Sequence, residues 1–167
     1  MPGISIEGGS TMRTSTETVI TTTETETYHW LGYAGLVPFV VTALAFIIDG
    51  ATLWFHLFSS YSLLIMSFMA GSWWGSEIRS GAPRLGWLVL SNIIALAGWA
   101  AFAYGMTHDT NPRALVSAFL LVQSINFAAL GWLDVSGRSG LKAAGYALFR
   151  LRLTIVVVLC HLLLFFA

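Results

Sequence analysis

The chain has 167 residues, of which 56% are hydrophobic and only 10% are charged, and its mean hydropathy is +0.76. A soluble domain carries about a quarter charged residues because water must wet its surface, so this composition excludes a soluble globular protein. Eight basic and eight acidic residues give a net charge of +0. Since a basic binding surface is missing from the composition, we expect no nucleic-acid partner.

Residues 1–29 differ in composition from everything that follows. Between Thr14 and Thr27 the chain is mostly Thr and Glu, with little apolar surface to offset the entropy lost on ordering. We therefore predict a disordered cytoplasmic tail. The segment also lacks the apolar core of a secretory signal and the arginine-rich, acid-poor character of a mitochondrial presequence. We accordingly expect a bacterial inner membrane rather than a mitochondrial inner membrane.

Five apolar runs follow, each close to the ~20 residues that cross ~30 Å of hydrocarbon as a helix. They cover residues 31–48, 53–75, 85–104, 114–133 and 146–166. None of them alternates between apolar and polar residues, as the strands of a membrane β-barrel do. The sequence therefore predicts an all-α, polytopic integral membrane protein, with five transmembrane helices bundled over residues 30–167.

The basic residues are distributed unequally between the two sides that five spans define. One side carries seven of them: Arg13, Arg79, Arg84, Arg138, Lys142, Arg150 and Arg152. The other side carries only Arg113. Because Lys and Arg in short loops stay on the cytoplasmic side, we expect the amino terminus inside and the carboxyl terminus outside.

Three segments of the chain resemble a family of five-span membrane proteins. They are Leu31–Phe39 (LGYAGLVPF), Tyr61–Gly75, which ends in SFMAGSWWG, and Arg150–Val158 (RLRLTIVVV). These segments are similar to the transmembrane protein 69-like family (domain of unknown function 3429), whose members occur in bacterial and mitochondrial membranes. The resemblance implies the five-span architecture and carries no established activity.

Charged residues gather at the predicted inner end of the bundle. They are Glu77, Arg79, Asp134, Arg150 and Arg152. Residues two apart on a helix point in nearly opposite directions, so we expect only one of Arg150 and Arg152 to face inward. An unpaired arginine near hydrocarbon is costly, and the inward one should therefore pair with Glu77 or Asp134. We favour a structural latch over a role in binding substrate or moving protons.

Uncharged amides are predicted deeper in the membrane, where they need hydrogen-bonding partners. Asn92 lies on the third run, and Gln123 and Asn126 lie three residues apart on the fourth. These three residues are the candidate ligand-binding set, which would line a polar pocket between the third and fourth spans. We favour the other interpretation, that they hold helices together through hydrogen bonds.

A stripe of small residues follows one face of the second run, where close approach of another helix is possible. It consists of Ser60, Ser67, Gly71 and Gly75. We expect this face to pack inside the bundle rather than against a second protein. Trp73 and Trp74, next to the stripe, are predicted to anchor the helix at the membrane interface.

Histidines and carboxylates cluster towards the outer side. The candidates are Asp49, His56, His108, Asp109 and His161. Imidazole and carboxylate groups suit zinc and other transition metals, but no two of these residues have a reliable ligand spacing on one element. We assign no metal site and expect no cofactor.

Three classes of function remain open. The first is a non-enzymatic accessory or assembly factor of a membrane complex, with the bilayer and a membrane protein or a second copy as partners. The second is a binder or carrier of a small molecule or lipid, with its site between the third and fourth spans. A membrane enzyme is the weakest, because the sequence has no nucleophile elbow, zinc-protease motif or phosphate-binding loop. We expect an accessory factor.

Overall fold

The computed structural model describes residues 29–107, 112–136 and 145–167. The predicted tail, apart from its last residue, therefore lies outside the described residues. The chain divides into two units, the first ending at Gly35 and the second covering Leu36–Ala167. In the first unit, residues 29–34 are helical, and the N–H of Gly35 donates to the carbonyl of Leu31.

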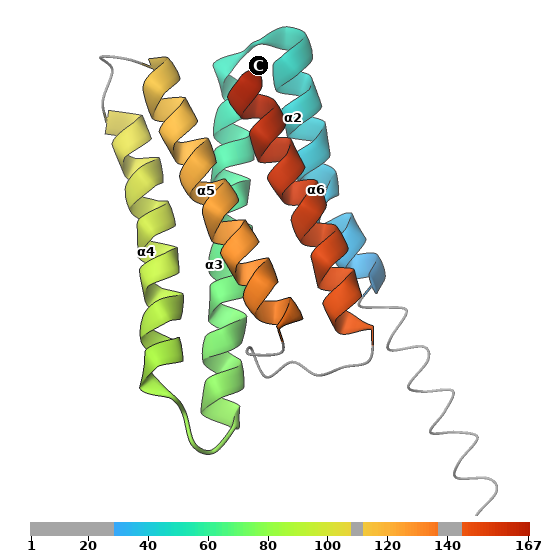
Figure 1. Ribbon diagram of the computed structural model, residues 1–167. Helices are drawn as coiled ribbons and strands as arrows, with labels where there is room; N and C mark the ends of the chain where they lie inside the picture. The colour runs from blue at the N-terminus through green and yellow to red at the C-terminus, as the bar shows by residue number, and fades with distance from the viewer. Residues whose placement is uncertain (1–28, 108–111, 137–144) are drawn as a thin grey trace, which may run out of the picture. The chain divides into compact units, whose positions relative to one another are not determined.

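The described part of the second unit contains five helices, which run side by side (Figure 1). They are α2 (Val37–Asp49), α3 (Thr52–Arg79), α4 (Leu85–Thr107), α5 (Pro112–Val135) and α6 (Tyr146–Phe166). Helix α3 packs against α2, α4 and α5, while α6 packs against α2 and α5, and α4 also contacts α5. Figure 1 shows that consecutive helices run in opposite directions.

The helix boundaries have local causes. Pro38 lies in the first turn of α2, where its missing N–H costs no intrahelical hydrogen bond. Gly50 ends α2 at φ 70° and donates to the carbonyl of Phe46, a left-handed conformation that glycine adopts without steric cost. The indole N–H of Trp54 donates to the Asp49 carboxylate at 2.8 Å across this turn. The chain can therefore reverse from α2 to α3 within two residues.

Within the residues that the structure describes, five helices are long and apolar enough to cross a membrane. They are His29–Asp49, Thr52–Arg79, Leu85–Gly105, Val116–Val135 and Ala147–Phe166. The predicted all-α fold with five spans is confirmed. The second span is longer than its apolar run, because α3 continues past residue 75 to Arg79.

Aromatic and aliphatic side chains fill the interior of the second unit. Phe39 of α2 packs edge-on against Phe58 of α3 and Phe127 of α5, with ring centroids 5.6 and 5.9 Å apart. All three rings are almost fully buried. Many other large apolar side chains, such as Phe68 and Ile125, are exposed instead. Lipid hydrocarbon accepts such side chains at no cost. Apolar side chains on the outside of the helices are therefore expected of a membrane protein.

Candidate functional site

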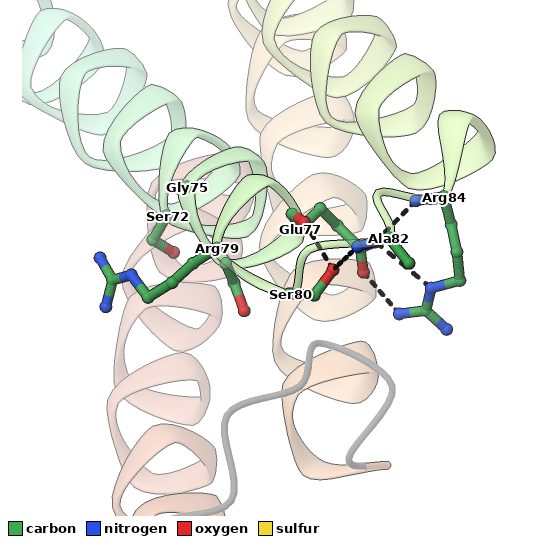
Figure 2. A pocket seen from close by; sticks show the side chains of 8 residues that line it. Ser72, Gly75, Glu77, Arg79, Ser80, Ala82 and Arg84 are labelled. Atoms are coloured by element: carbon green, nitrogen blue, oxygen red, sulfur yellow. Dashed lines mark hydrogen bonds and ion pairs between the residues drawn. The ribbon is translucent and has the colours of Figure 1, made fainter.

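One end of the bundle carries two ion pairs, at the turn between α3 and α4 and between the facing ends of α5 and α6. We call it the arginine end, after Arg79, Arg84, Arg150 and Arg152. Figure 2 shows the part of it around the last turn of α3.

Glu77, in the last turn of α3, holds the turn to α4 in place. Its side chain is largely buried and forms an ion pair with Arg84. The backbone N–H of Arg84 also donates to Glu77 Oε2 at 3.0 Å, and Arg84 Nε donates to the same oxygen at 3.3 Å. Hydrogen bonding to Glu77 raises the pKa of the Arg84 guanidinium above its usual value. The pair therefore fixes the turn while cancelling the carboxylate charge.

Asp134, near the end of α5, accepts hydrogen bonds from two other helices. Trp73 Nε1 of α3 donates to Oδ1 at 2.7 Å. Arg150 of α6 donates to Oδ2 through Nε at 2.8 Å and forms an ion pair there through Nη2. The Asp134 side chain has no exposed surface. A buried carboxylate is tolerated only when it is paired and hydrogen-bonded, and Asp134 meets both conditions.

Two tryptophans connect the ion pairs. The Arg84 guanidinium lies over the Trp87 ring, 5.3 Å from its centroid, as in a cation–π contact. Trp87 of α4 meets Trp73 edge-on at 5.7 Å, and Trp73 donates to Asp134. The contacts thus run without interruption from Glu77 to Arg150 and join α3, α4, α5 and α6. These contacts connect the ends of four helices.

The structure brings together only part of the predicted charge cluster. Arg150 faces inward and pairs with Asp134, which confirms one of the two pairings expected. Arg152 is exposed, as is Arg79, and Glu77 binds Arg84 rather than an arginine of the last span. The prediction that Trp73 anchors its helix at the membrane interface is wrong. Its side chain is 1% exposed and donates a hydrogen bond to Asp134.

Sequence reasoning missed Arg84 as a member of the cluster. The signal was present, because Gly81 and Pro83 predict a tight turn between Glu77 and Arg84. Gly81 has φ 74°, the conformation that lets the chain return towards α3. A turn of this kind brings residues seven apart to one another.

A hollow of about 800 Å³ opens beside the last turns of α3 (Figure 2). We call it the α3-end hollow. The residues that line it are Ser72, Gly75, Ser76, Glu77, Arg79, Ser80, Ala82 and Arg84. Figure 2 places the side chains of Arg79 and Arg84 on opposite sides of the helix end. Arg84 is engaged with Glu77, whereas Arg79 has no ion-pair partner among the described residues.

The three amides do not form one site. Gln123 of α5 is fully buried, and its Oε1 accepts from Asn126 Nδ2 at 3.3 Å. The same Asn126 nitrogen contacts Met66 Sδ of α3 at 3.4 Å. Asn92 is exposed and donates to the carbonyl of Leu88, one turn earlier on α4. Asn92, Gln123 and Asn126 therefore do not line one pocket, because Asn92 lies on the surface and Gln123 lies inside. The contact of Asn126 with Met66 does connect α5 to α3.

The small-residue stripe also faces outward. Ser60, Ser67, Gly71 and Gly75 are all exposed. A Cβ atom added at Gly71 or Gly75 would meet no atom within 4 Å. The prediction that this stripe packs inside the bundle is wrong for the part of the chain that the structure describes.

Two other glycines lie where side chains of neighbouring helices come close to the backbone. A Cβ at Gly98 of α4 would lie 2.9 Å from Met66 Sδ and 3.1 Å from Gln123 Oε1. A Cβ at Gly131 of α5 would lie 2.5 Å from Thr154 Oγ1 of α6. Such distances are shorter than van der Waals contact. A side chain at Gly131 would therefore collide with the short, β-branched Thr154. At Gly98 the nearest atoms belong to the flexible end of Met66, and at Gly71 the described residues leave the space open.

A second, smaller hollow lies between α3 and α4, along the stripe. Its volume is about 280 Å³. We call it the α3–α4 groove, lined by Ser67, Ala70, Gly71, Trp74, Ser91, Asn92 and Ala95. Most of these residues are small, and the exposed amide of Asn92 joins the serines Ser67 and Ser91 as its polar groups.

The histidine candidates are separated. His108 and Asp109 lie outside the described residues. His56 is exposed, whereas His161 is fully buried among Phe39, Phe58 and Phe127. Within the described ranges no three His, Cys, Asp or Glu side chains are placed to hold a metal ion.

His161 takes part in the packing of the core. Its Nδ1 lies 2.8 Å from the carbonyl of Val157, and its Nε2 lies 2.8 Å from Ser62 Oγ. A carbonyl only accepts, so Nδ1 carries the proton and the Ser62 hydroxyl donates to Nε2. Ser62 and His161 both have 0% exposed surface, so the pair joins α3 to α6 rather than facing a substrate.

The five apolar helices and the paired charges at their ends define a multi-pass α-helical membrane protein. Residues 25–166 match the profile of a family described as protein of unknown function (DUF3429), and the chain belongs to this family. No curated protein and no solved structure matches the chain.

Proposed function

We propose that this protein is a non-enzymatic accessory or assembly factor that holds a transmembrane helix of a partner membrane protein in the α3–α4 groove. The observation that carries the proposal is the open space at Gly71, which lines this groove. Small residues allow two helix backbones to approach closely. A Cβ at Gly71 would meet no atom of the described chain within 4 Å, so this position is available to a helix from outside.

Asn92 supports a helix rather than lipid as the occupant of the groove. An amide facing hydrocarbon is costly unless it finds a partner. Asn92 Nδ2 already donates to Leu88 O at 2.8 Å, yet the amide still has acceptor capacity. A hydrogen-bonding side chain on a neighbouring helix would use this capacity, and such contacts contribute roughly 0.6 to 2 kcal/mol each. Lipid tails offer no donor.

The alternative is a binder or carrier of a small molecule or lipid with a polar site between α4 and α5. It has less support because Gln123 has 0% exposed surface and Asn126 is engaged with Gln123 and Met66. A ligand there would first have to separate the helices.

We further propose that the amino terminus is cytoplasmic and the carboxyl terminus outside, since seven of the eight basic residues belong to one side. A thiol placed by Ser80→Cys should then react only with reagents on the cytoplasmic side, and one placed by Asp49→Cys only from outside. The proposed location is a bacterial inner membrane, with the mitochondrial inner membrane as the alternative. Immunodetection in fractionated membranes separates the two.

The experiment that tests the function compares matched glycine variants. Gly71→Leu fills the α3–α4 groove, whereas Gly86→Leu places the same side chain on α4 outside it; both positions have open space around a Cβ. Protein extracted gently from its native membrane is measured for assembly mass by light scattering, and its partner is identified by mass spectrometry.

The proposal expects a stoichiometric assembly with a second membrane protein for wild type and Gly86→Leu, but free protein for Gly71→Leu. Asn92→Leu should weaken the assembly about threefold to thirtyfold, because one interhelical hydrogen bond is lost. An assembly that survives Gly71→Leu, or that contains only copies of this chain, would refute it.

A further inference from the structure

The α3-end hollow combines an arginine with a surface that lacks bulky side chains. Ser72, Gly75 and Ser76 line its wall on α3, and Arg79 lies one turn beyond Gly75 at the end of the same helix. A Cβ at Gly75 would meet nothing within 4 Å, so this wall is not occupied by another part of the described chain.

Arg79 supplies the charge of the hollow. Glu77 and Arg84 both line the hollow, but they neutralise one another in an ion pair. Arg79 is exposed and has no acidic partner among the residues that the structure describes. The hollow therefore carries about one net positive charge, on a group whose planar fork matches phosphate oxygens.

The position of the hollow places it at the depth of lipid headgroups. Helix α3 is a candidate span that ends at Arg79. Trp74, which is 41% exposed, lies little more than one turn before this end, as tryptophans at a membrane interface do. Guanidinium groups at the end of a span extend to the interface, where phosphodiesters are the abundant anions. This holds for either orientation of the chain in the membrane.

The serine hydroxyls add a preference among headgroups. Ser72 Oγ donates its proton to the carbonyl of Met69 at 2.7 Å, and Ser80 Oγ donates to the carbonyl of Glu77 at 2.7 Å. A hydroxyl has one proton but two lone pairs, and only one lone pair of Ser80 is used, by the N–H of Ala82 at 3.4 Å. Towards a ligand these oxygens can therefore only accept, which favours a headgroup that carries hydrogen-bond donors, such as glycerol.

We propose that the α3-end hollow binds an anionic phospholipid with a hydroxyl-bearing headgroup, with its phosphodiester on Arg79 and its headgroup hydroxyls on Ser72 and Ser80. This site is separate from the α3–α4 groove. The two proposals can therefore fail independently.

Native mass spectrometry of the purified full chain in maltoside detergent tests the site. The probes are dioleoyl phosphatidylglycerol and dioleoyl phosphatidylcholine, which share their tails and differ in charge and headgroup donors. Arg79→Gln removes the charge from the hollow, and Gly75→Leu fills it without a clash. The controls are Arg152→Gln, which removes an exposed arginine from α6, and Gly86→Leu.

Wild type should bind one phosphatidylglycerol in preference to phosphatidylcholine. Arg79→Gln should weaken this binding about fivefold, and Gly75→Leu should weaken it at least as much, while both controls stay within about twofold of wild type. Equal binding of the two lipids, or an equal loss with Arg79→Gln and Arg152→Gln, would overturn the proposal. So would displacement of the lipid by inorganic phosphate, which would identify a soluble phosphate as the ligand.

Discussion

Replacing Gly131 of α5 with alanine places a methyl group against Thr154 of α6. The added Cβ would lie 2.5 Å from Thr154 Oγ1, 2.6 Å from Cγ2 and 2.9 Å from Cβ. Non-bonded heavy atoms prefer about 3.5 to 4.0 Å, so the helices must separate by about 1 Å. Thr154 is β-branched and stiff, and it cannot rotate all of these atoms away.

Overpacking of this kind costs about 1 to 3 kcal/mol, whereas alanine in a helix gains up to about 1 kcal/mol over glycine. We expect Gly131→Ala to lower the free energy of unfolding by about 1 to 2 kcal/mol. Gly71→Ala should leave it unchanged or raise it slightly, because its Cβ meets nothing. Reversible unfolding in mixed micelles measures both values.

A double variant tests the same contact between Gly131 and Thr154 in a second way. Combining Gly131→Ala with Thr154→Ala removes Oγ1 and Cγ2 and leaves only the contact with Cβ. The double variant should therefore lose less stability than the sum of the two single changes. If Gly131→Ala and Gly71→Ala unfold with the same free energy, the distinction between packing glycines and exposed glycines is wrong.

Three further predictions concern the buried polar contacts. Asp134→Asn should destabilise the protein by about 3 kcal/mol because it removes the buried carboxylate charge that Arg150 contacts, and exchanging the two residues should restore part of the lost expression; no recovery would contradict the pairing. Trp73→Phe removes the indole donor to Asp134 and should cost about 1 to 3 kcal/mol in unfolding measurements. Ser62→Ala leaves His161 Nε2 without its donor, with an expected loss of about 1 to 2 kcal/mol in the same measurement; an unchanged value would argue against this hydrogen bond.

The fold could be predicted from the sequence because the bilayer imposes strong constraints. Only helices satisfy their own backbone in hydrocarbon, so the apolar runs determine both the type and the number of elements. The extension of α3 to Arg79 was missed because Glu77 interrupts the apolar pattern. Its charge is cancelled by Arg84, and this contact depends on the conformation of the turn at Gly81.

The candidate site was only partly predictable. The pairing of Arg150 with Asp134 follows from the cost of an unpaired charge near hydrocarbon. Which glycines pack inside could not be read from spacing, since Gly71 and Gly75 have the favoured four-residue separation and yet face outward. Gly98 and Gly131 have no glycine four residues away in their helices, and their role depends on which face α3 and α6 present to them.

The central proposal is that the α3–α4 groove receives a helix of a partner protein. Site-specific photocrosslinking in intact native membranes tests it most directly. A photoreactive side chain is placed at the position of Gly71 and, as a control, at the exposed position of Ile155 on α6. We predict one discrete adduct with a second membrane protein from position 71, absent from position 155 and reduced by Asn92→Leu. Adducts with lipid alone at position 71, or the same protein adducts at both positions, would contradict the account.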